Sequence, residues 1–299
     1  MDVVGANAGT DILVQLITPE ELPVCECRHH EEHKRLTPSR NGSSKTSSTS
    51  GEQPGIFQLL RSWQPPFFIF FVSILEVSVF LCGGPVVQQL FVYDPHHREQ
   101  VWRFLTYMLL HSDTLHLSFN IVIQFVLAAP LEHEQGHLRT SLIYLGGVLG
   151  GSLGTSMLEP ELYVMGASGG VYALLISQLA NILLNFRVLP YKLHRAVAVG
   201  VLAVGDIAAT LYHYFSLGNV CPRISWAAHS SGALAGFLLG LLLFKDSHKR
   251  GAHIAPVAGE DGIAWPRVAR WVAAALLGAA VTAAVICNIL LPPPPKSAD

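Results

Sequence analysis

Charged residues are scarce in this sequence. Asp, Glu, Lys and Arg make up 13% of its 299 residues, whereas hydrophobic residues make up 51%. A soluble domain usually carries about 25% charged residues, so this composition excludes an ordinary soluble domain and predicts a membrane protein. The net charge is only -2 and no basic stripe is present, so we expect the lipid bilayer, and not nucleic acid, as a partner.

Cysteine is also rare, and its spacing is irregular. An odd number without a regular pattern does not indicate a disulfide framework, and the spacing does not show whether any two are paired. Two of the cysteines lie in the segment from Cys25 to His33, which contains metal-ligand residue types but lacks the paired spacing of a structural zinc site. We therefore expect no metal there, with reversible acylation of the two cysteines as an alternative role. The five cysteines are Cys25, Cys27, Cys82, Cys221 and Cys287.

We also expect no cleavable signal peptide. Met1 to Leu16 contains acidic residues and has no basic region before an apolar core, so we expect the first apolar span to act as a signal anchor. Residues 1–55 are polar, and the serine-rich tract from Pro38 to Gly55 has too little apolar surface to fold. These residues are predicted to form a flexible cytoplasmic arm.

Long apolar runs are what the sequence has in abundance. Windows of about 19 residues detect seven of them, and several are near the lower length limit for crossing a bilayer as a helix. We therefore predict an all-α membrane protein with seven transmembrane helices. The runs are Phe67 to Gly83, Leu115 to Leu131, Ser141 to Leu158, Val164 to Leu184, Ala196 to Phe215, Trp226 to Phe244 and Trp271 to Leu291.

Lysine and arginine are distributed unevenly among the segments that connect these runs. They gather in the amino-terminal arm and in alternate loops, including residues 246–270. Because basic residues favour the cytoplasmic side, we expect a cytoplasmic amino terminus, an external loop at residues 84–114 and a luminal or extracellular tail at residues 292–299. The external loop contains Trp102-Arg103, which we interpret as an interfacial tryptophan beside a snorkelling arginine.

The fourth run contains a serine among small residues. The sequence Gly-Ala-Ser-Gly at residues 166–169 includes Ser168, and Tyr172 lies one helical turn further on the same face. Taken alone, small residues in a membrane helix usually serve close packing. A catalytic interpretation becomes stronger only because polar residues occur at matching positions in two other runs.

These two polar clusters open the second and sixth runs. His116 and Asn120 are four residues apart and therefore share a helix face. His229 shares a face with the glycines at positions 232, 236 and 240, where another backbone can come closest. Alternating topology makes the second, fourth and sixth helices run in the same direction, which places all these side chains about 5 to 8 Å below the outer surface.

A serine and a histidine at the same depth can perform acyl transfer. We predict that Ser168 is the nucleophile and that His229 is its general base and later the acid. His116 and Asn120, together with the backbone N–H near the serine, would stabilise the oxyanion. No acid stands out at this depth, so we predict a two-residue dyad whose imidazole is oriented by stacking on Tyr172.

Two acidic residues, Glu76 and Asp206, lie inside predicted helices. An ionisable group in the membrane is costly and is often functional. Neither residue has an evident partner in the sequence, so we expect both to be protonated and hydrogen-bonded within the packing. A transporter or channel that uses them as a pathway is the alternative, but the order of the runs shows no inverted or tandem repeat.

Together these motifs resemble those of the rhomboid family of intramembrane serine proteases, over roughly Pro66 to Phe244. The resemblance implies a six-helix bundle core within residues 56–245, an active site open to the outer side, and a seventh C-terminal transmembrane helix at residues 271–291. It also implies the dyad and oxyanion residues given above, without any metal or organic cofactor. The residues that carry it are Trp102, Arg103, His111, His116, Asn120, Gly166, Ala167, Ser168, Gly169, Tyr172, Ala228, His229, Gly232, Gly236 and Gly240.

The resemblance implies a substrate class as well. The six-plus-one order is similar to that of animal secretory-pathway rhomboids, which release epidermal-growth-factor-like ligands from membrane precursors and so activate receptor signalling. The expected partners are therefore single-span membrane proteins at the Golgi, endosome or plasma membrane. Hydrolysis would occur near the outer end of the substrate helix, at a small residue above helix-weakening residues.

The alternative within the same family is a catalytically inactive protein that binds client helices and controls their trafficking. Inactive relatives lose the serine or the histidine, or carry a proline just before the serine position. Here Ala167 precedes Ser168, and both catalytic residue types are present. The sequence therefore favours the protease.

Overall fold

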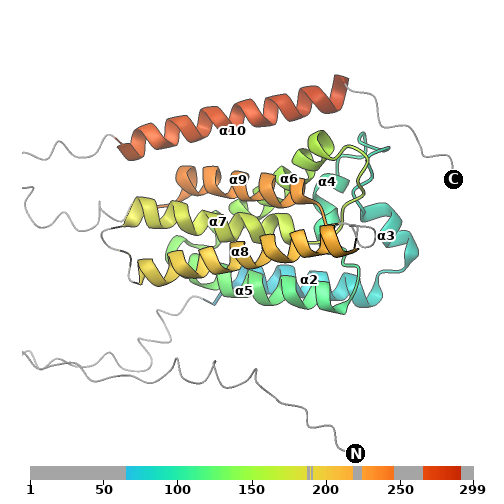
Figure 1. The fold of residues 1–299 in the computed structure, drawn as a ribbon, viewed down its shortest axis with the longest axis horizontal. Coiled ribbons are helices and arrows are strands. Elements are labelled where there is room, and N and C mark those ends of the chain that lie inside the picture. Colours follow the sequence, from blue (N-terminus) through green and yellow to red (C-terminus); the bar gives the residue numbers. More distant parts are fainter. Residues whose placement is uncertain (1–64, 187–188, 190, 218–223, 246–264, 291–299) are drawn as a thin grey trace, which may run out of the picture. The chain divides into compact units, whose positions relative to one another are not determined.

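The computed structural model describes residues 65–186, 189, 191–217, 224–245 and 265–290, and these residues are almost entirely helical. All of them belong to one unit, Pro54–Asp299, while the predicted arm at residues 1–55 lies outside the described residues. Figure 1 shows the apolar helices running alongside one another. They are α2 (Phe67–Cys82), α5 (Thr114–Gln135), α6 (His137–Leu158), α7 (Ser168–Asn185), α8 (Lys192–Leu217), α9 (Trp226–Leu243) and α10 (Trp265–Leu290).

Each of the seven predicted transmembrane runs corresponds to a helix, although some helices begin or end at other residues than predicted. Six helices, α5 to α10, are long and apolar enough to cross a membrane, and α2 is a shorter apolar helix of 16 residues. The predicted all-α membrane fold, a rhomboid-like bundle followed by a C-terminal apolar helix, is confirmed. The start of α10 lies at Trp265, inside the segment that the sequence assigned to a loop, because Pro266 supplies the fixed φ suited to a first helical turn.

The fourth predicted helix begins later than expected. Val164 is not helical but forms an antiparallel bridge with Tyr93, in which each backbone N–H donates to the other residue's carbonyl at 3.1 and 3.3 Å. Gly166 then adopts a φ of +112°, which lies outside the right-handed helical region. Pairing with a distant segment therefore keeps this stretch extended, and Ser168 becomes the first residue of α7.

Helix α7 lies at the centre of the packing, against α6 and α9. Small residues bring the backbones together, since a Cβ at Gly236 of α9 would lie only 2.6 Å from the carbonyl carbon of Ala173. A Cβ at Gly232 would likewise lie 3.0 Å from the Cα of Gly169. These glycines cannot gain a side chain without moving a helix, which is the close packing expected of small residues in membranes.

A buried polar network joins α2, α5 and α6. Glu76 is fully buried and accepts hydrogen bonds from Gln124 Nε2 at 2.8 Å and from the Tyr144 hydroxyl at 3.0 Å. The hydrogen-bonded packing role predicted for Glu76 is confirmed. At the start of α2, the buried carboxylate of Glu132 accepts the N–H groups of Phe68 and Ile69 at 3.2 and 3.0 Å, so it satisfies donors that the helix leaves open.

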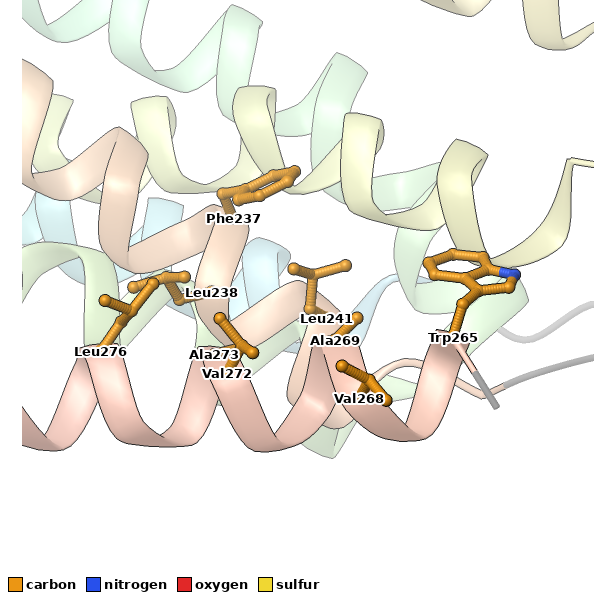
Figure 2. A pocket seen from close by; sticks show the side chains of 9 residues that line it. All are labelled: Phe237, Leu238, Leu241, Trp265, Val268, Ala269, Val272, Ala273 and Leu276. Carbon is orange, nitrogen blue, oxygen red and sulfur yellow. The ribbon is translucent and has the colours of Figure 1, made fainter. Parts of the chain in front are cut away.

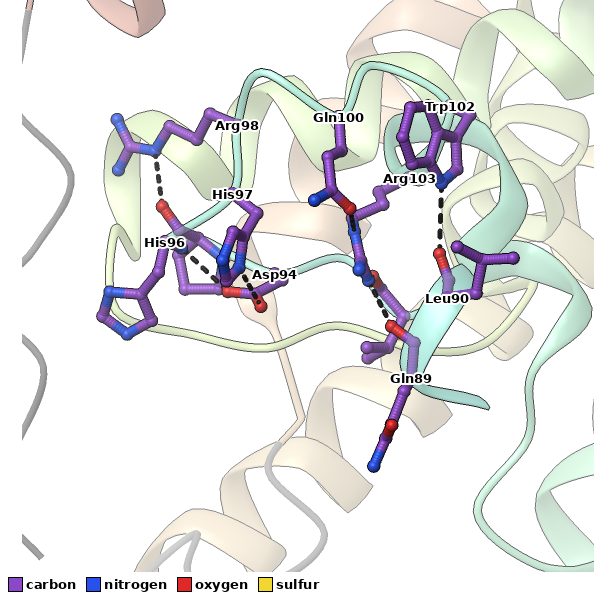
Figure 3. A network of polar contacts seen from close by, with 11 residues as sticks. Gln89, Leu90, Asp94, His96, His97, Arg98, Gln100, Trp102 and Arg103 are labelled. Carbon is purple, nitrogen blue, oxygen red and sulfur yellow. Dashed lines mark hydrogen bonds and ion pairs between the residues drawn. The ribbon is translucent and has the colours of Figure 1, made fainter. Parts of the chain in front are cut away.

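The loop between α2 and α5 is more ordered than the sequence indicated. It contains two short helices, α3 (Pro85–Phe91) and α4 (Arg103–Thr106), followed by the 3₁₀ helix η1 (Tyr107–Leu109). Asp94 accepts hydrogen bonds from the His96 N–H at 2.8 Å and from His97 Nδ1 at 2.7 Å (Figure 3). Burial raises the pKa of Asp94, but these hydrogen bonds outweigh burial and leave it below its ordinary value.

The prediction that Arg103 snorkels to the interface is wrong. Its guanidinium is buried and donates to the carbonyls of Gln89 and Val92 at 2.6 and 2.8 Å, while Nε donates to Gln100 Oε1 at 2.6 Å. Figure 3 shows this side chain turned toward the end of α3, with the Trp102 indole donating to the Leu90 carbonyl at 3.1 Å. The open carbonyls at the end of a short helix offer stronger partners than the interface does.

Candidate active site

The position of Ser168 is set by the turn that precedes it. The Gly166 N–H donates to the Tyr107 carbonyl at 3.0 Å, and a Cβ at Gly166 would lie 2.9 Å from Nε2 of His116. Glycine is therefore required here both by the positive φ and by the approach of an imidazole ring. The first helical hydrogen bonds run from Gly170 and Val171 to the Ala167 carbonyl, so the N–H groups at Ser168 occupy the positive end of α7.

His229 lies in the first turn of α9. The preceding Ser225 caps this helix, since its hydroxyl oxygen accepts the Ala228 N–H at 3.0 Å, and it also donates to Glu159 Oε2 at 2.6 Å. Glu159 follows α6 and its carboxylate also accepts the Ala227 N–H at 3.1 Å. The start of α9 is thus tied to the loop that leads into α7, which fixes the helix that carries the histidine.

Tyr172 connects the two predicted catalytic positions. Its ring stacks on the imidazole of His229 with a centroid separation of 4.3 Å and an interplanar angle of 21°, which is the stacking that the sequence predicted. Because Tyr172 is one turn beyond Ser168 in α7, the stack brings the imidazole to the helix face that begins with the serine. Among the described residues no hydrogen bond joins Ser168 to His229, and such contacts are often loose before a substrate binds.

The two predicted oxyanion residues differ in their surroundings. The imidazole of His116 lies against Gly166, next to the turn before Ser168, with its Nδ1 3.1 Å from the Ser112 hydroxyl. Asn120 is buried and donates to the His116 carbonyl at 2.8 Å within its own helix, so its amide would have to turn to take the predicted oxyanion role.

His111 supports His116 from the preceding loop. The two rings meet edge to face at a centroid separation of 5.1 Å, and His111 is buried. Burial, followed by repulsion from His116, lowers the pKa of His111 to about 4. His111 is therefore neutral at neutral pH.

Sequence reasoning missed two neighbours of the site. The hydroxyl of Tyr107 donates to the Val148 carbonyl at 2.7 Å and lies 3.0 Å from where a Cβ at Gly169 would be, so Tyr107 packs under the serine turn. The other is Asp206 of α8, whose Oδ2 lies 3.8 Å from Nδ1 of His229. The sequence had marked Asp206 as an ionisable residue inside a membrane helix, but it gave no sign that Asp206 lies beside His229.

Comparison with known proteins identifies the family. Residues 98–246 match the model of the Rhomboid domain. A mouse protein, Rhomboid-related protein 2, is 33% identical over 244 residues, which cover 77% of this chain and 76% of the relative. The chain belongs to the rhomboid family. Human Rhomboid-related protein 3 is 34% identical over 257 residues, covering 77% of this chain and 60% of the relative.

The family includes both intramembrane proteases and inactive members. Inactive rhomboid-related protein 2 of Caenorhabditis elegans is 28% identical to this rhomboid over 217 residues, covering 68% of this chain and 62% of the relative. Membership therefore restricts this rhomboid to a protease or an inactive relative. The choice between these depends on the chemistry that the site residues can perform.

An apolar groove lies apart from the rhomboid site, between α9 and α10. Figure 2 shows Phe237 and Leu241 of α9 facing Trp265 and Leu276 of α10. Its lining has almost no polar surface, so it offers no group for acid–base chemistry. Within the described part of the chain, no group of three or more His, Cys, Asp and Glu side chains is arranged to hold a metal ion.

Proposed function

We propose that this rhomboid is an intramembrane serine endopeptidase that uses Ser168 and His229 as a catalytic dyad. The observation that carries the proposal is the stacking of Tyr172 on His229. The stack holds an imidazole at the face of the helix that starts with the serine, and an aromatic pair of this kind is stabilised by about 1 kcal/mol beyond its buried area.

In the proposed reaction His229 takes the hydroxyl proton of Ser168 while Oγ attacks the substrate carbonyl carbon. The resulting oxyanion is stabilised by the N–H groups at the start of α7 and by His116, which lies beside the turn. The imidazolium then gives its proton to the leaving amine, and water hydrolyses the acyl-enzyme in a second cycle of the same steps. Asn120 adds a donor once its amide turns away from its own helix.

The proposed substrates are single-span membrane proteins, with membrane-tethered growth-factor-like precursors as the first class to test. A peptide bond inside a helix has its carbonyl hydrogen-bonded, so the substrate helix must open near its outer end. We propose a cytoplasmic arm at residues 1–55, a protease core at 56–245 and a cytoplasmic loop before α10. Residence in the secretory pathway follows from that substrate class.

Reconstitution of the full chain in liposomes with a single-span precursor tests the dyad. We expect Ser168→Ala and His229→Ala each to reduce cleavage by about a thousandfold or more. Ser177→Ala is the matched control, because Ser177 is a serine of the same helix whose hydroxyl donates only within that helix, to the Leu174 carbonyl at 2.8 Å. It should retain cleavage within about twofold.

The same variants distinguish the inactive alternative. If the natural chain and Ser168→Ala cleave equally, the dyad is wrong. If neither cleaves and both retain the precursor inside cells to the same extent, this rhomboid is a client-binding protein. Mass spectrometry of the released fragment locates the cut, and cleavage outside the outer third of the substrate helix would contradict the proposed depth.

A further inference from the structure

The carboxylate of Asp206 has an unusual position. It is the sole acidic residue of α8, an apolar helix whose Lys192–Tyr212 portion is long enough to cross a membrane. An acid in such a segment is costly unless it has a partner or faces water. The Asp206 side chain is 39% exposed, and its Oδ2 lies 3.8 Å from Nδ1 of His229. Within its own helix it accepts only a long hydrogen bond of 3.4 Å from the Thr210 hydroxyl.

Asp206 approaches Nδ1 of His229. A hydrogen bond at this nitrogen is what orients a catalytic imidazole. If His229 is the base, its Nε2 takes the serine proton, so Nδ1 must carry the other hydrogen. Stacking on Tyr172 fixes the plane of the ring but does not select the tautomer or the rotation within that plane. A hydrogen-bond acceptor at Nδ1 selects the tautomer and also fixes the rotation of the ring within its plane.

We propose that Asp206 is a positioning residue for His229, held on α8 and directed at Nδ1 of the imidazole. The inference rests on the proposed function, since it assigns a partner to the proposed base. The Ser168 proton goes to Nε2 of His229, and the carboxylate stays unprotonated while it accepts the Nδ1–H and stabilises the imidazolium. This role differs from the one we expected from the sequence, in which Asp206 is protonated and hydrogen-bonded within the packing.

The distance of 3.8 Å is longer than a hydrogen bond, for which about 2.7 to 3.2 Å is typical. Oδ2 of Asp206 would have to move roughly 1 Å closer to Nδ1 of His229, which is a small displacement for α8. Only 6% of the residues in its most apolar stretch are buried, and its main contacts are with α7. A helix held so lightly can move toward α9 when a substrate occupies the site, which makes Asp206 a partner that completes the site on binding.

Steady-state kinetics of the full chain in liposomes test the proposal. We expect Asp206→Asn to lower kcat by about tenfold or more while KM stays within about twofold, because an amide can also donate and no longer selects the Nδ1–H tautomer. Asp206→Glu should restore part of kcat, since it keeps the carboxylate. Val204→Ala is the control on the same helix, because Val204 is exposed, and it should change kcat by less than about twofold.

Each outcome has a distinct meaning. If Asp206→Asn keeps the natural kcat while Ser168→Ala and His229→Ala abolish cleavage, the dyad stands and the positioning role is overturned. A rise in KM at constant kcat also overturns it, because Asp206 would then act in substrate entry. If Ser168→Ala still cleaves, the proposed function fails and the positioning role fails with it. Thermal unfolding of Asp206→Asn and Asp206→Glu, compared with the natural chain, shows whether a loss of kcat reflects misfolding.

Discussion

Helices α7 and α8 both approach His229, but they are held in opposite ways. In their most apolar stretches 72% of the residues of α7 are buried, against 6% of those of α8. Helix α7 offers Tyr172 in ring-to-ring contact, whereas α8 offers Asp206 at a distance longer than a hydrogen bond. The candidate site therefore has a rigid side, α7, that holds Ser168 and a loose side, α8, that is free to move.

Adding one methyl group next to each helix tests most strongly whether α7 is held more tightly than α8. A Cβ at Gly236 would lie 2.6 Å from the carbonyl carbon of Ala173, whereas a Cβ at Gly200 of α8 would meet nothing within 4 Å. We expect Gly236→Ala to lower the free energy of unfolding by about 3 kcal/mol through overpacking. Gly200→Ala should raise it by up to about 1 kcal/mol, since alanine favours a helix.

Denaturant titration of both variants in the same lipid mixture measures the difference. Each replaces glycine by alanine inside a helix, so the intrinsic helix propensity contributes equally to both. Equal effects at the two positions would show that α7 and α8 are held alike.

Acid should weaken the contacts that support the turn before α7, where His111 packs on His116 and His116 lies against Gly166. Burial, and then repulsion from His116, lowers the pKa of His111 from 6.5 to about 4 in the folded chain. Between these values the unfolded chain binds more protons, so the contribution of neutral His111 is complete above about pH 6.5 and is lost as the pH falls toward 4. The loss is about 3 kcal/mol at most.

The free energy of unfolding as a function of pH checks this expectation. The variant His111→Gln should show a flatter slope between pH 6.5 and 4 than the natural chain, whatever its stability at neutral pH. A slope that does not change with this substitution would assign the acid sensitivity to other groups.

The smallest expected effect concerns the stack itself. The Tyr172 hydroxyl has no hydrogen-bond partner among the described residues, so Tyr172→Phe should retain the cleavage rate within about twofold. Tyr172→Ala removes the ring and should lower the rate by about tenfold, which corresponds to the upper range of an aromatic pair. If both variants lose activity equally, the hydroxyl contributes and the ring contact alone does not explain the role of Tyr172.

Much of the helical architecture could be predicted, because apolar runs in a membrane protein report helices directly. The close packing of the glycines of α9 could also be predicted, since their spacing places them on one face with His229. The features that could not be predicted depend on contacts between residues far apart in the sequence. The start of α7 was misplaced because the bridge from Tyr93 keeps Val164 extended, and Arg103 was turned the wrong way because its carbonyl acceptors lie on α3.

The proximity of Asp206 to His229 was missed for a related reason. Periodicity gives the face of a residue on its own helix, but the rotation of one helix against another depends on all the side chains packed between them. Helix α8 has few such contacts, so its sequence carries little information about its orientation. The stacking of Tyr172 on His229 was therefore predictable, and the approach of Asp206 to His229 was not.

The close contact of α7 with α9 also has a consequence for the order in which the chain is made. Synthesis delivers Ser168 to the membrane before α8 and α9 exist, and Gly169 has no Gly232 to meet until α9 has entered. The serine therefore acquires its histidine only when the last helix of the bundle closes onto α7. A nascent chain that stops short of α9 therefore lacks the imidazole that the proposed reaction requires.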